Sequence, residues 1–250
     1  MSATPAEAGP VRIAMWSGPR NISTALMRAW ENRDDCCVVD EPFYACYLHV
    51  TGIDHPMRDE VLASQPRDWG AVIESLSGPL PPGVRVQYQK HMTHHMVGPL
   101  DPAWLTTVRH AFLIRDPVEM VASYAQKRGA VTVDDLGLPK QVEIYRRVAE
   151  VTGREPPVVE ARDVLRAPEA ALRRLCEALG VPFSRQMLSW PPGLRDSDGV
   201  WARHWYNAVA ESTGFAPFTP REITLPEPLM RVARDCGPHF EFLRARKLEV

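Results

Sequence analysis

The sequence lacks the features that mark several large classes of protein. Its 250 residues carry a formal net charge of -2, so there is no basic surplus of the kind that supplies most of the affinity for nucleic acid. No apolar run approaches the ~20 residues that a membrane-spanning helix needs. The five cysteines are odd in number and form no CxxC pair, which argues against a disulfide framework and a zinc knuckle. We therefore expect a cytoplasmic protein with free thiols, no metal site, and neither nucleic acid nor membrane as a partner.

Two further absences bear on domain organisation. Residues 1–10, MSATPAEAGP, have neither the basic start nor the apolar core of a signal peptide, and we expect a disordered tail there. The chain has no internal repeat and no low-complexity segment, and the turn-rich stretch at 190–199 is typical of an exposed loop. Hydrophobic residues make up 45% of the sequence, which is enough for a packed core. We predict a single domain over residues 1–250.

Short apolar runs alternate with segments of helical periodicity. Strands are predicted at 11–16, 36–42, 84–90, 110–114 and 157–161. Helices are predicted from about Ser23, in pieces over 43–76, from Asp116, over 139–151, over 168–179, and from about 221 with a break at Gly237-Pro238. This alternation predicts an α/β fold with three layers, α/β/α, around a mostly parallel sheet, of the P-loop nucleotide-binding type.

The stretch WSGPRNIST, residues 16–24, joins the first strand to the first helix. Loops at the carboxyl ends of parallel strands bind ligands, and a helix N-terminus favours an anion. Gly18 lets the backbone turn closely, whereas Pro19 has no N–H, so the anion cradle must come from 20–24. Arg20 adds a permanent charge and a planar fork of donors. The predicted phosphate-binding residues are Ser17, Gly18, Pro19, Arg20, Asn21, Ile22, Ser23 and Thr24.

A second anion site is predicted in LIRDPVEMVASY, residues 113–124. Arg115 ends the fourth strand and can fork onto a phosphate. Ser123 lies two turns into the following helix and reaches the same oxygens if its face points at the pocket. Asp116 is a good N-cap for this helix, and Glu119 is positioned to complete a capping box.

These two motifs together resemble the paired cofactor motifs of the sulfotransferase family. A third segment, VVEARDVLRAPEAALRRLCEALGVPF, is similar to a later strand, turn and helix of that family, so the resemblance extends over residues 11–183. It implies 3′-phosphoadenosine 5′-phosphosulfate (PAPS) as co-substrate, with 20–24 around the 5′-phosphosulfate and Arg115 and Ser123 on the 3′-phosphate. It also implies a small-molecule acceptor with a hydroxyl or amine. Cytosolic members often have lysine where Arg20 stands.

Sulfuryl transfer also calls for a group that takes the acceptor proton. Glu41, after the second strand, is one candidate base, and the resemblance to bacterial and Golgi-type members favours it. The stretch QKHMTHH supplies the other, His91, with His94 and His95 following at an uncertain register. Lys90 is expected to stabilise the bridging oxygen beside Arg20. The choice between Glu41 and a histidine of 91–95 stays open.

The late stretch DGVWARHWYNAVAESTGF, residues 198–215, is rich in aromatic and basic residues. In the family a late loop closes over the cofactor, and Arg203 is the candidate for its basic contact with the 3′-phosphate. The sequence identifies neither the acceptor nor the oligomeric state.

Two other functions fit the first motif. One is a P-loop nucleoside triphosphate enzyme, kinase-like, with Asp40 supporting magnesium. Its G-x-x-x-x-G-K-[ST] pattern is not met, because the second glycine and the lysine are missing. The other is a catalytically inactive module that still binds nucleotide.

Overall fold

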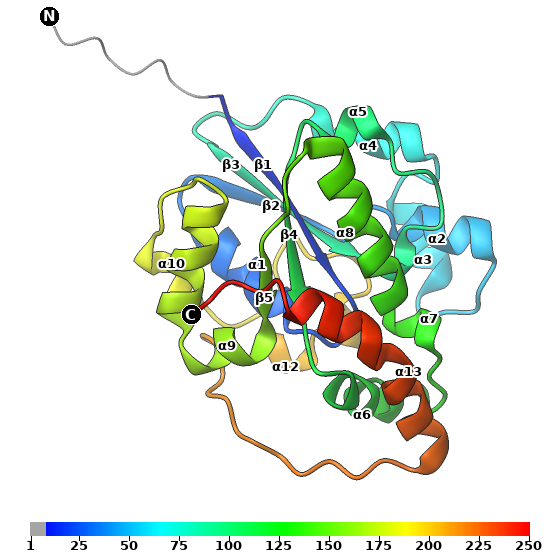
Figure 1. The fold of residues 1–250 in the computed structure, drawn as a ribbon. Helices are drawn as coiled ribbons and strands as arrows, with labels where there is room; N and C mark the ends of the chain where they lie inside the picture. Colours follow the sequence, from blue (N-terminus) through cyan, green and yellow to red (C-terminus); the bar gives the residue numbers. More distant parts are fainter. Residues whose placement is uncertain (1–8) are drawn as a thin grey trace, which may run out of the picture.

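The computed structural model describes residues 9–250, which form five parallel strands and the helices around them (Figure 1). The strand order across the sheet is β2-β3-β1-β4-β5. The strands are β1 (Val11–Ser17), β2 (Cys36–Asp40), β3 (Val86–Met92), β4 (Arg109–Ile114) and β5 (Val158–Glu160). The predicted α/β fold is therefore confirmed, with every strand pair parallel. Of the predicted tail, residues 1–8 lie outside the described residues.

Alternate residues of β1 enter two different hydrophobic cores. Ile13 and Met15 belong to one core, whereas Ala14 and Trp16 belong to the other. Successive side chains of a strand point to opposite faces, so each core fills one face of the sheet. Helices cover both faces, and accordingly β1 is apolar over 13–16 and β4 over 111–114. The other central strand, β3, also buries polar side chains.

The first core lies under α1 (Ser23–Glu31) and α10 (Pro168–Ala178), and the second under α8 (Leu138–Thr152) and α13 (Glu227–Arg244). The remaining helices are α2 (Tyr44–Thr51), α3 (Arg58–Ser64), α4 (Trp69–Ser77), α5 (Pro102–Leu105), α6 (Pro117–Arg128), α7 (Val133–Leu136), α9 (Ala161–Arg166), α11 (Ala202–Trp205) and α12 (Asn207–Ala210), with 3₁₀ turns η1 (Thr93–His95) and η2 (Arg185–Leu188). Within residues 9–250, no helix is both long and apolar enough to cross a membrane.

The last helix corrects one prediction. The sequence predicts a break at Gly237-Pro238, whereas α13 runs through both residues. Proline removes one backbone hydrogen bond from a helix interior and crowds the preceding turn. The helix nevertheless buries Ala233, Cys236 and Phe240 against its neighbours, and tertiary packing of this kind overrides local propensity.

The start of α6 corrects a second prediction, the capping box of Asp116 and Glu119. The Asp116 carboxylate accepts hydrogen bonds from the backbone N–H groups of Val118 and Glu119, at 2.8 and 3.3 Å, so it is the predicted N-cap. The Glu119 carboxylate, however, does not turn back to close a capping box. It accepts a hydrogen bond from Nε of Arg115 at 2.8 Å. Glu119 therefore forms an ion pair with Arg115 instead of capping the helix.

Candidate active site

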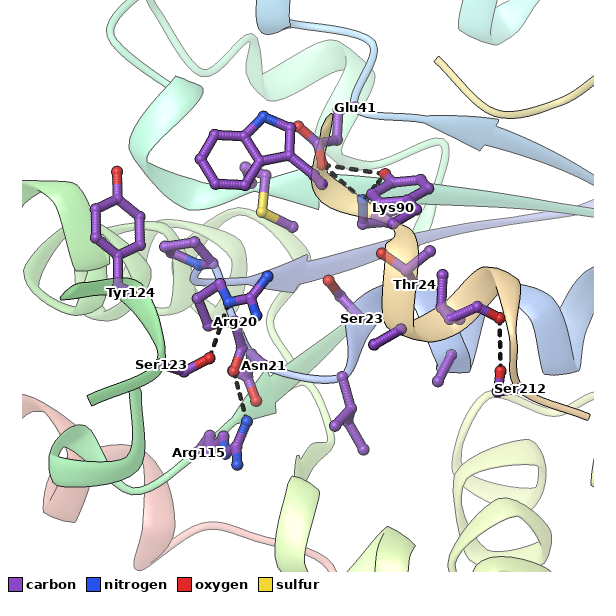
Figure 2. A pocket seen from close by; sticks show the side chains of 18 of the residues that line it. Arg20, Asn21, Ser23, Thr24, Glu41, Lys90, Arg115, Ser123, Tyr124 and Ser212 are labelled. Atoms are coloured by element: carbon purple, nitrogen blue, oxygen red, sulfur yellow. Dashed lines mark hydrogen bonds and ion pairs between the residues drawn. The ribbon is translucent and has the colours of Figure 1, made fainter. Parts of the chain in front are cut away.

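A cavity of about 360 Å³ opens where β1, β2, β3 and β4 end at one edge of the sheet (Figure 2). Its walls come from the loops that follow these strands and from the late segment around α11 and α12. The lining residues are Pro19, Arg20, Asn21, Ile22, Ser23, Thr24, Ala25, Glu41, Tyr44, His55, Lys90, Met92, His94, His95, Arg115, Ser123, Tyr124, Leu165, Trp205, Tyr206, Ala208, Val209, Ser212, Gly214, Phe215 and Ala216. Both predicted anion motifs thus reach the same cavity.

The loop between β1 and α1 has an unusual backbone. Arg20 and Ile22 have φ values of 58° and 48°, a left-handed conformation that costs energy for residues other than glycine. Asn21 holds the loop in place, because its Nδ2 donates to the carbonyl of Leu113 in β4 at 2.8 Å. The first turn of α1 has no side-chain cap. Its N–H groups are therefore available to an anion in the cavity.

Ser17 and Gly18 do not line the cavity. Ser17 is fully buried, and its carbonyl accepts a hydrogen bond from the Thr93 hydroxyl at 3.3 Å. Gly18 packs against α7, where a Cβ atom would come within 2.4 Å of the Leu136 carbonyl oxygen. Glycine is thus required here for close packing. The predicted contact of these two residues with the cofactor remains a prediction.

Arg20, Arg115 and Ser123 meet at one end of the cavity (Figure 2). Nη1 of Arg115 donates to the Arg20 carbonyl at 2.8 Å, and Nε of Arg20 donates to the Ser123 hydroxyl at 2.9 Å. Burial and the nearby charge of Arg115 lower the pKa of Arg20. Among the described residues, Glu119 pairs with Arg115, and no carboxylate pairs with Arg20. This end of the cavity therefore carries excess positive charge.

Glu41 and Lys90 lie together on another wall of the same cavity (Figure 2). Nζ of Lys90 is buried and donates to Asp40 Oδ1 at 2.9 Å, to Glu41 Oε1 at 2.6 Å and to the hydroxyl of Tyr206 at 2.5 Å. An ammonium group has three N–H donors, and these three contacts use all of them. In this arrangement Lys90 has no donor left for a bridging oxygen, the role predicted for it.

The cluster holds two carboxylates and one ammonium group. Burial would lower the pKa of Lys90, but Asp40 and Glu41 outweigh it and raise that pKa. Burial raises the pKa of Glu41, with Lys90 opposing and Asp40 adding to the shift. Glu41 also has a φ of 43°, and only its Oε1 accepts hydrogen bonds from the described side chains. Its Oε2 is available to take a proton.

His91 points away from the cavity. It lies within β3 and stacks on Trp16, with ring centroids 4.5 Å apart, on the face of the sheet opposite Lys90. Burial lowers its pKa to about 3. The sequence suggested that the strand ends at residue 90, but β3 continues to Met92, so residue 91 follows the strand's alternation. We therefore do not retain His91 as a base. His94 and His95, in η1, do line the cavity.

The late segment contributes differently from the prediction. Arg203 is exposed and does not line the cavity, whereas Trp205 and Tyr206 do. Sequence reasoning missed His55 and Tyr124 as lining residues. His55 lies between two helices in a stretch with no motif, so no local signal marks it. Tyr124 follows Ser123 directly, and its position beside a predicted ligand residue was the available signal.

Comparison with solved structures gives the same fold. The sulfotransferase from Alicyclobacillus acidocaldarius matches with a TM-score of 0.54 at 14% identity, over 96% of this chain and 98% of that one. A sulfotransferase from Mycobacterium avium matches with a TM-score of 0.50 at 12% identity, over 97% and 78%. At such low identity the likeness concerns the fold alone.

Comparison with curated sequences finds two proteins of Arabidopsis thaliana. Branched-chain-amino-acid aminotransferase-like protein 2 is 35% identical over 93% of this chain, and branched-chain-amino-acid aminotransferase-like protein 1 is 38% identical over 84%. The matched regions are 41% and 37% of those proteins' own lengths, so this chain spans about two fifths of the relatives it matches. Residues 11–245 match the family described as the sulfotransferase domain. On that match, which takes in every strand and both anion motifs, the chain belongs to the sulfotransferase domain family.

Proposed function

We propose that this protein transfers a sulfuryl group from PAPS to a hydroxyl or amine of a small-molecule acceptor, by in-line displacement with a general base. PAPS supplies the activated sulfuryl group when it is bound. The observation that carries the proposal is the Arg20–Arg115 pair, which leaves one end of the cavity positive, with no carboxylate of residues 9–250 paired to Arg20. Two like charges side by side are costly unless an anion binds between or beside them.

Each group at the cavity has a role in this proposal. The uncapped first turn of α1 and Arg20 bind the 5′-phosphosulfate and stabilise charge that develops on the leaving oxygen. Arg115 and Ser123 bind the 3′-phosphate. Glu41 takes the acceptor proton, and its raised pKa suits it to that task near neutral pH. Lys90, held by Asp40 and Tyr206, keeps the Glu41 carboxylate in position.

The residues fit PAPS better than magnesium and a nucleoside triphosphate. Both oxygens of Asp40, the candidate magnesium ligand, accept hydrogen bonds from Tyr206, and Lys90 and the Gly199 N–H add one contact each. Asp40 is buried and does not line the cavity. Its carboxylate is thus committed to the protein. The five cysteines are free thiols, which is consistent with the cytoplasmic location that we propose.

Binding of adenosine 3′,5′-bisphosphate tests the proposal. At 100 times its dissociation constant, this product should stabilise the protein by about 2.7 kcal/mol, measured by thermal unfolding. We expect Arg115→Ala to lose most of that shift, and Arg147→Ala, a partly exposed arginine on α8, to keep it. ATP with magnesium should stabilise the protein less. A full shift in Arg115→Ala, or a larger shift with ATP and magnesium, would contradict the proposal.

A further inference from the structure

Six rings form a continuous group beside Glu41, here called the ring cluster: Tyr44, Tyr47, His55, His94, His95 and Trp205. His95 is sandwiched between Tyr44 and Tyr47, with ring centroids 4.4 and 5.0 Å away. The Tyr44 hydroxyl hydrogen-bonds to Nδ1 of His55, and the His55 ring stacks on Trp205 at 5.6 Å. Segments that follow β2 and β3 thus join the late segment through these rings.

One member of the ring cluster, His95, lies next to Oε2 of Glu41, the carboxylate oxygen that is available to take a proton. Nδ1 of His95 lies 3.9 Å from Glu41 Oε2, whereas Oε1 is bonded to Lys90 on the other side. Every member of the cluster except Tyr47 lines the cavity. The two arginines of the anion site lie at a different end, next to Ser123 (Figure 2). An acceptor that reaches Oε2 therefore rests against the rings.

This wall carries no charge at neutral pH. Burial lowers the pKa of His94 to about 3 and that of His55 to about 4, and it lowers the pKa of His95 far below its ordinary value. Burial raises the pKa of Tyr44. Arg128 in α6 lowers the pKa of His55 further and Asp135 in α7 opposes that shift, but neither residue lines the cavity.

We propose that the acceptor is an uncharged alcohol or phenol with an apolar, ring-bearing body that packs against Tyr44, His55 and Trp205. Apolar and aromatic surface is stabilised there by burial and by ring stacking, whereas a charged body against these rings would lose its hydration without gaining a charged partner among them. This inference rests on the proposed function and narrows it from hydroxyls and amines to uncharged hydroxyl compounds.

The transfer step then balances. The bond between the acceptor oxygen and sulfur forms as the bond between sulfur and the 5′-phosphate oxygen breaks. The hydroxyl proton goes to Oε2 of Glu41, and adenosine 3′,5′-bisphosphate leaves with the electron pair of the broken bond.

Three phenols of nearly one size test the acceptor class: 4-ethylphenol, which is neutral, tyramine, which is cationic, and 4-hydroxyphenylacetate, which is anionic. With PAPS, we expect kcat/KM for 4-ethylphenol to exceed that for each charged compound by about tenfold or more. Calorimetry with the enzyme bound to adenosine 3′,5′-bisphosphate measures binding of the same three compounds. A preference for a charged phenol, or no binding and no turnover of 4-ethylphenol, overturns the inference.

Variants of Trp205 test the surface itself. Trp205→Ala should raise KM for 4-ethylphenol about tenfold, and Trp205→Phe, which keeps a ring, should raise it less. The thermal shift with adenosine 3′,5′-bisphosphate should be unchanged in both. Asn207→Ala, an exposed change on the same segment, is the control and should leave KM unchanged. If adenosine 3′,5′-bisphosphate does not stabilise the unmodified protein, the proposed function itself is wrong. Failure of the proposed function and failure of the acceptor inference are therefore distinguishable.

Discussion

At the scale of single residues, Glu41 shows how environment sets chemistry. As a residue type it does not differ from any other glutamate, but the fold buries it beside Asp40, and one of its carboxylate oxygens accepts a hydrogen bond from Lys90. Burial disfavours its charged form, while the ammonium group of Lys90 favours it. Its pKa is raised on balance. This places its protonation closer to the neutral range, where a general base works best.

The pH profile of turnover follows from that shift. Only deprotonated Glu41 accepts a proton, so we expect kcat to fall as pH drops through its raised pKa, above the ordinary value of 4.5. Glu41→Gln should lower kcat by about 10²–10⁴-fold and remove this acid limb, with the bisphosphate thermal shift retained. Rates measured from pH 5 to 9 with 4-ethylphenol would check this. Unchanged kcat in Glu41→Gln would exclude Glu41 as the base.

At the scale of elements, the packing of α7 against the first loop explains Gly18. A methyl group there would overlap the backbone oxygen of Leu136 at 2.4 Å and the side chain of Met120 at 2.8 Å. The glycine is therefore a packing requirement of the loop–helix contact.

We expect Gly18→Ala to lower the free energy of unfolding by about 1–3 kcal/mol, because it overpacks a filled contact. Gly237→Ala is the matched control: it lies in α13 with open space around its Cβ position, so helix propensity should make it stabilising by up to about 1 kcal/mol. Urea unfolding of both variants measures the difference. Equal effects in the two variants would show that the Leu136 contact does not limit position 18.

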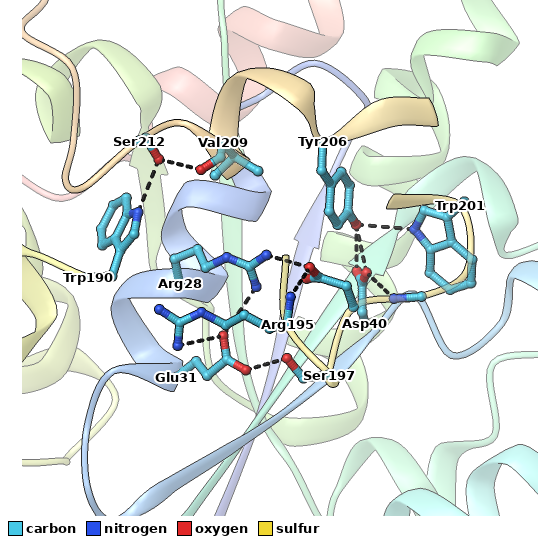
Figure 3. A network of polar contacts seen from close by, with 12 residues as sticks. Arg28, Glu31, Asp40, Trp190, Arg195, Ser197, Trp201, Tyr206, Val209 and Ser212 are labelled. Atoms are coloured by element: carbon cyan, nitrogen blue, oxygen red, sulfur yellow. Dashed lines mark hydrogen bonds and ion pairs between the residues drawn. The ribbon is translucent and has the colours of Figure 1, made fainter. Parts of the chain in front are cut away.

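At the scale of the whole molecule, a buried polar network ties the late segment to the sheet and to α1 (Figure 3). Arg28, fully buried, donates to Asp198 at 2.6 Å and to Glu31 at 3.2 Å. Tyr206 donates to Asp40 at 2.7 Å. The indole of Trp190 donates to the Ser212 hydroxyl at 3.0 Å. The Arg28–Asp198 bond thus joins segments 170 residues apart in sequence. Of the residues in this network, Tyr206 and Ser212 line the cavity.

Breaking this network should cost much more than breaking a surface pair. Arg28→Met leaves the Asp198 carboxylate buried without its partner, and we expect a loss of about 3–5 kcal/mol in the free energy of unfolding. Arg147→Ala removes an exposed pair with Glu150 and should cost no more than about 1 kcal/mol. Chemical denaturation measures both values. A loss below about 1 kcal/mol in Arg28→Met would mean that the late segment is held by other contacts.

The alternation of strands and helices in the sequence was enough to predict the parallel α/β sheet and the edge at which both anion motifs lie. Strand–helix alternation places every loop after a strand at the same edge. Arg20 and Arg115 come close because β1 and β4 are neighbours in the sheet, and the pattern of the sequence does not give that strand order. The direction in which individual side chains point depends on where a strand ends and on contacts between residues distant in sequence, and these are visible only in the folded structure. Because β3 runs two residues beyond its predicted end, His91 faces the core and Lys90 faces the cavity. Because Tyr206 reaches Asp40 across the fold, Lys90 is held away from the role predicted for it.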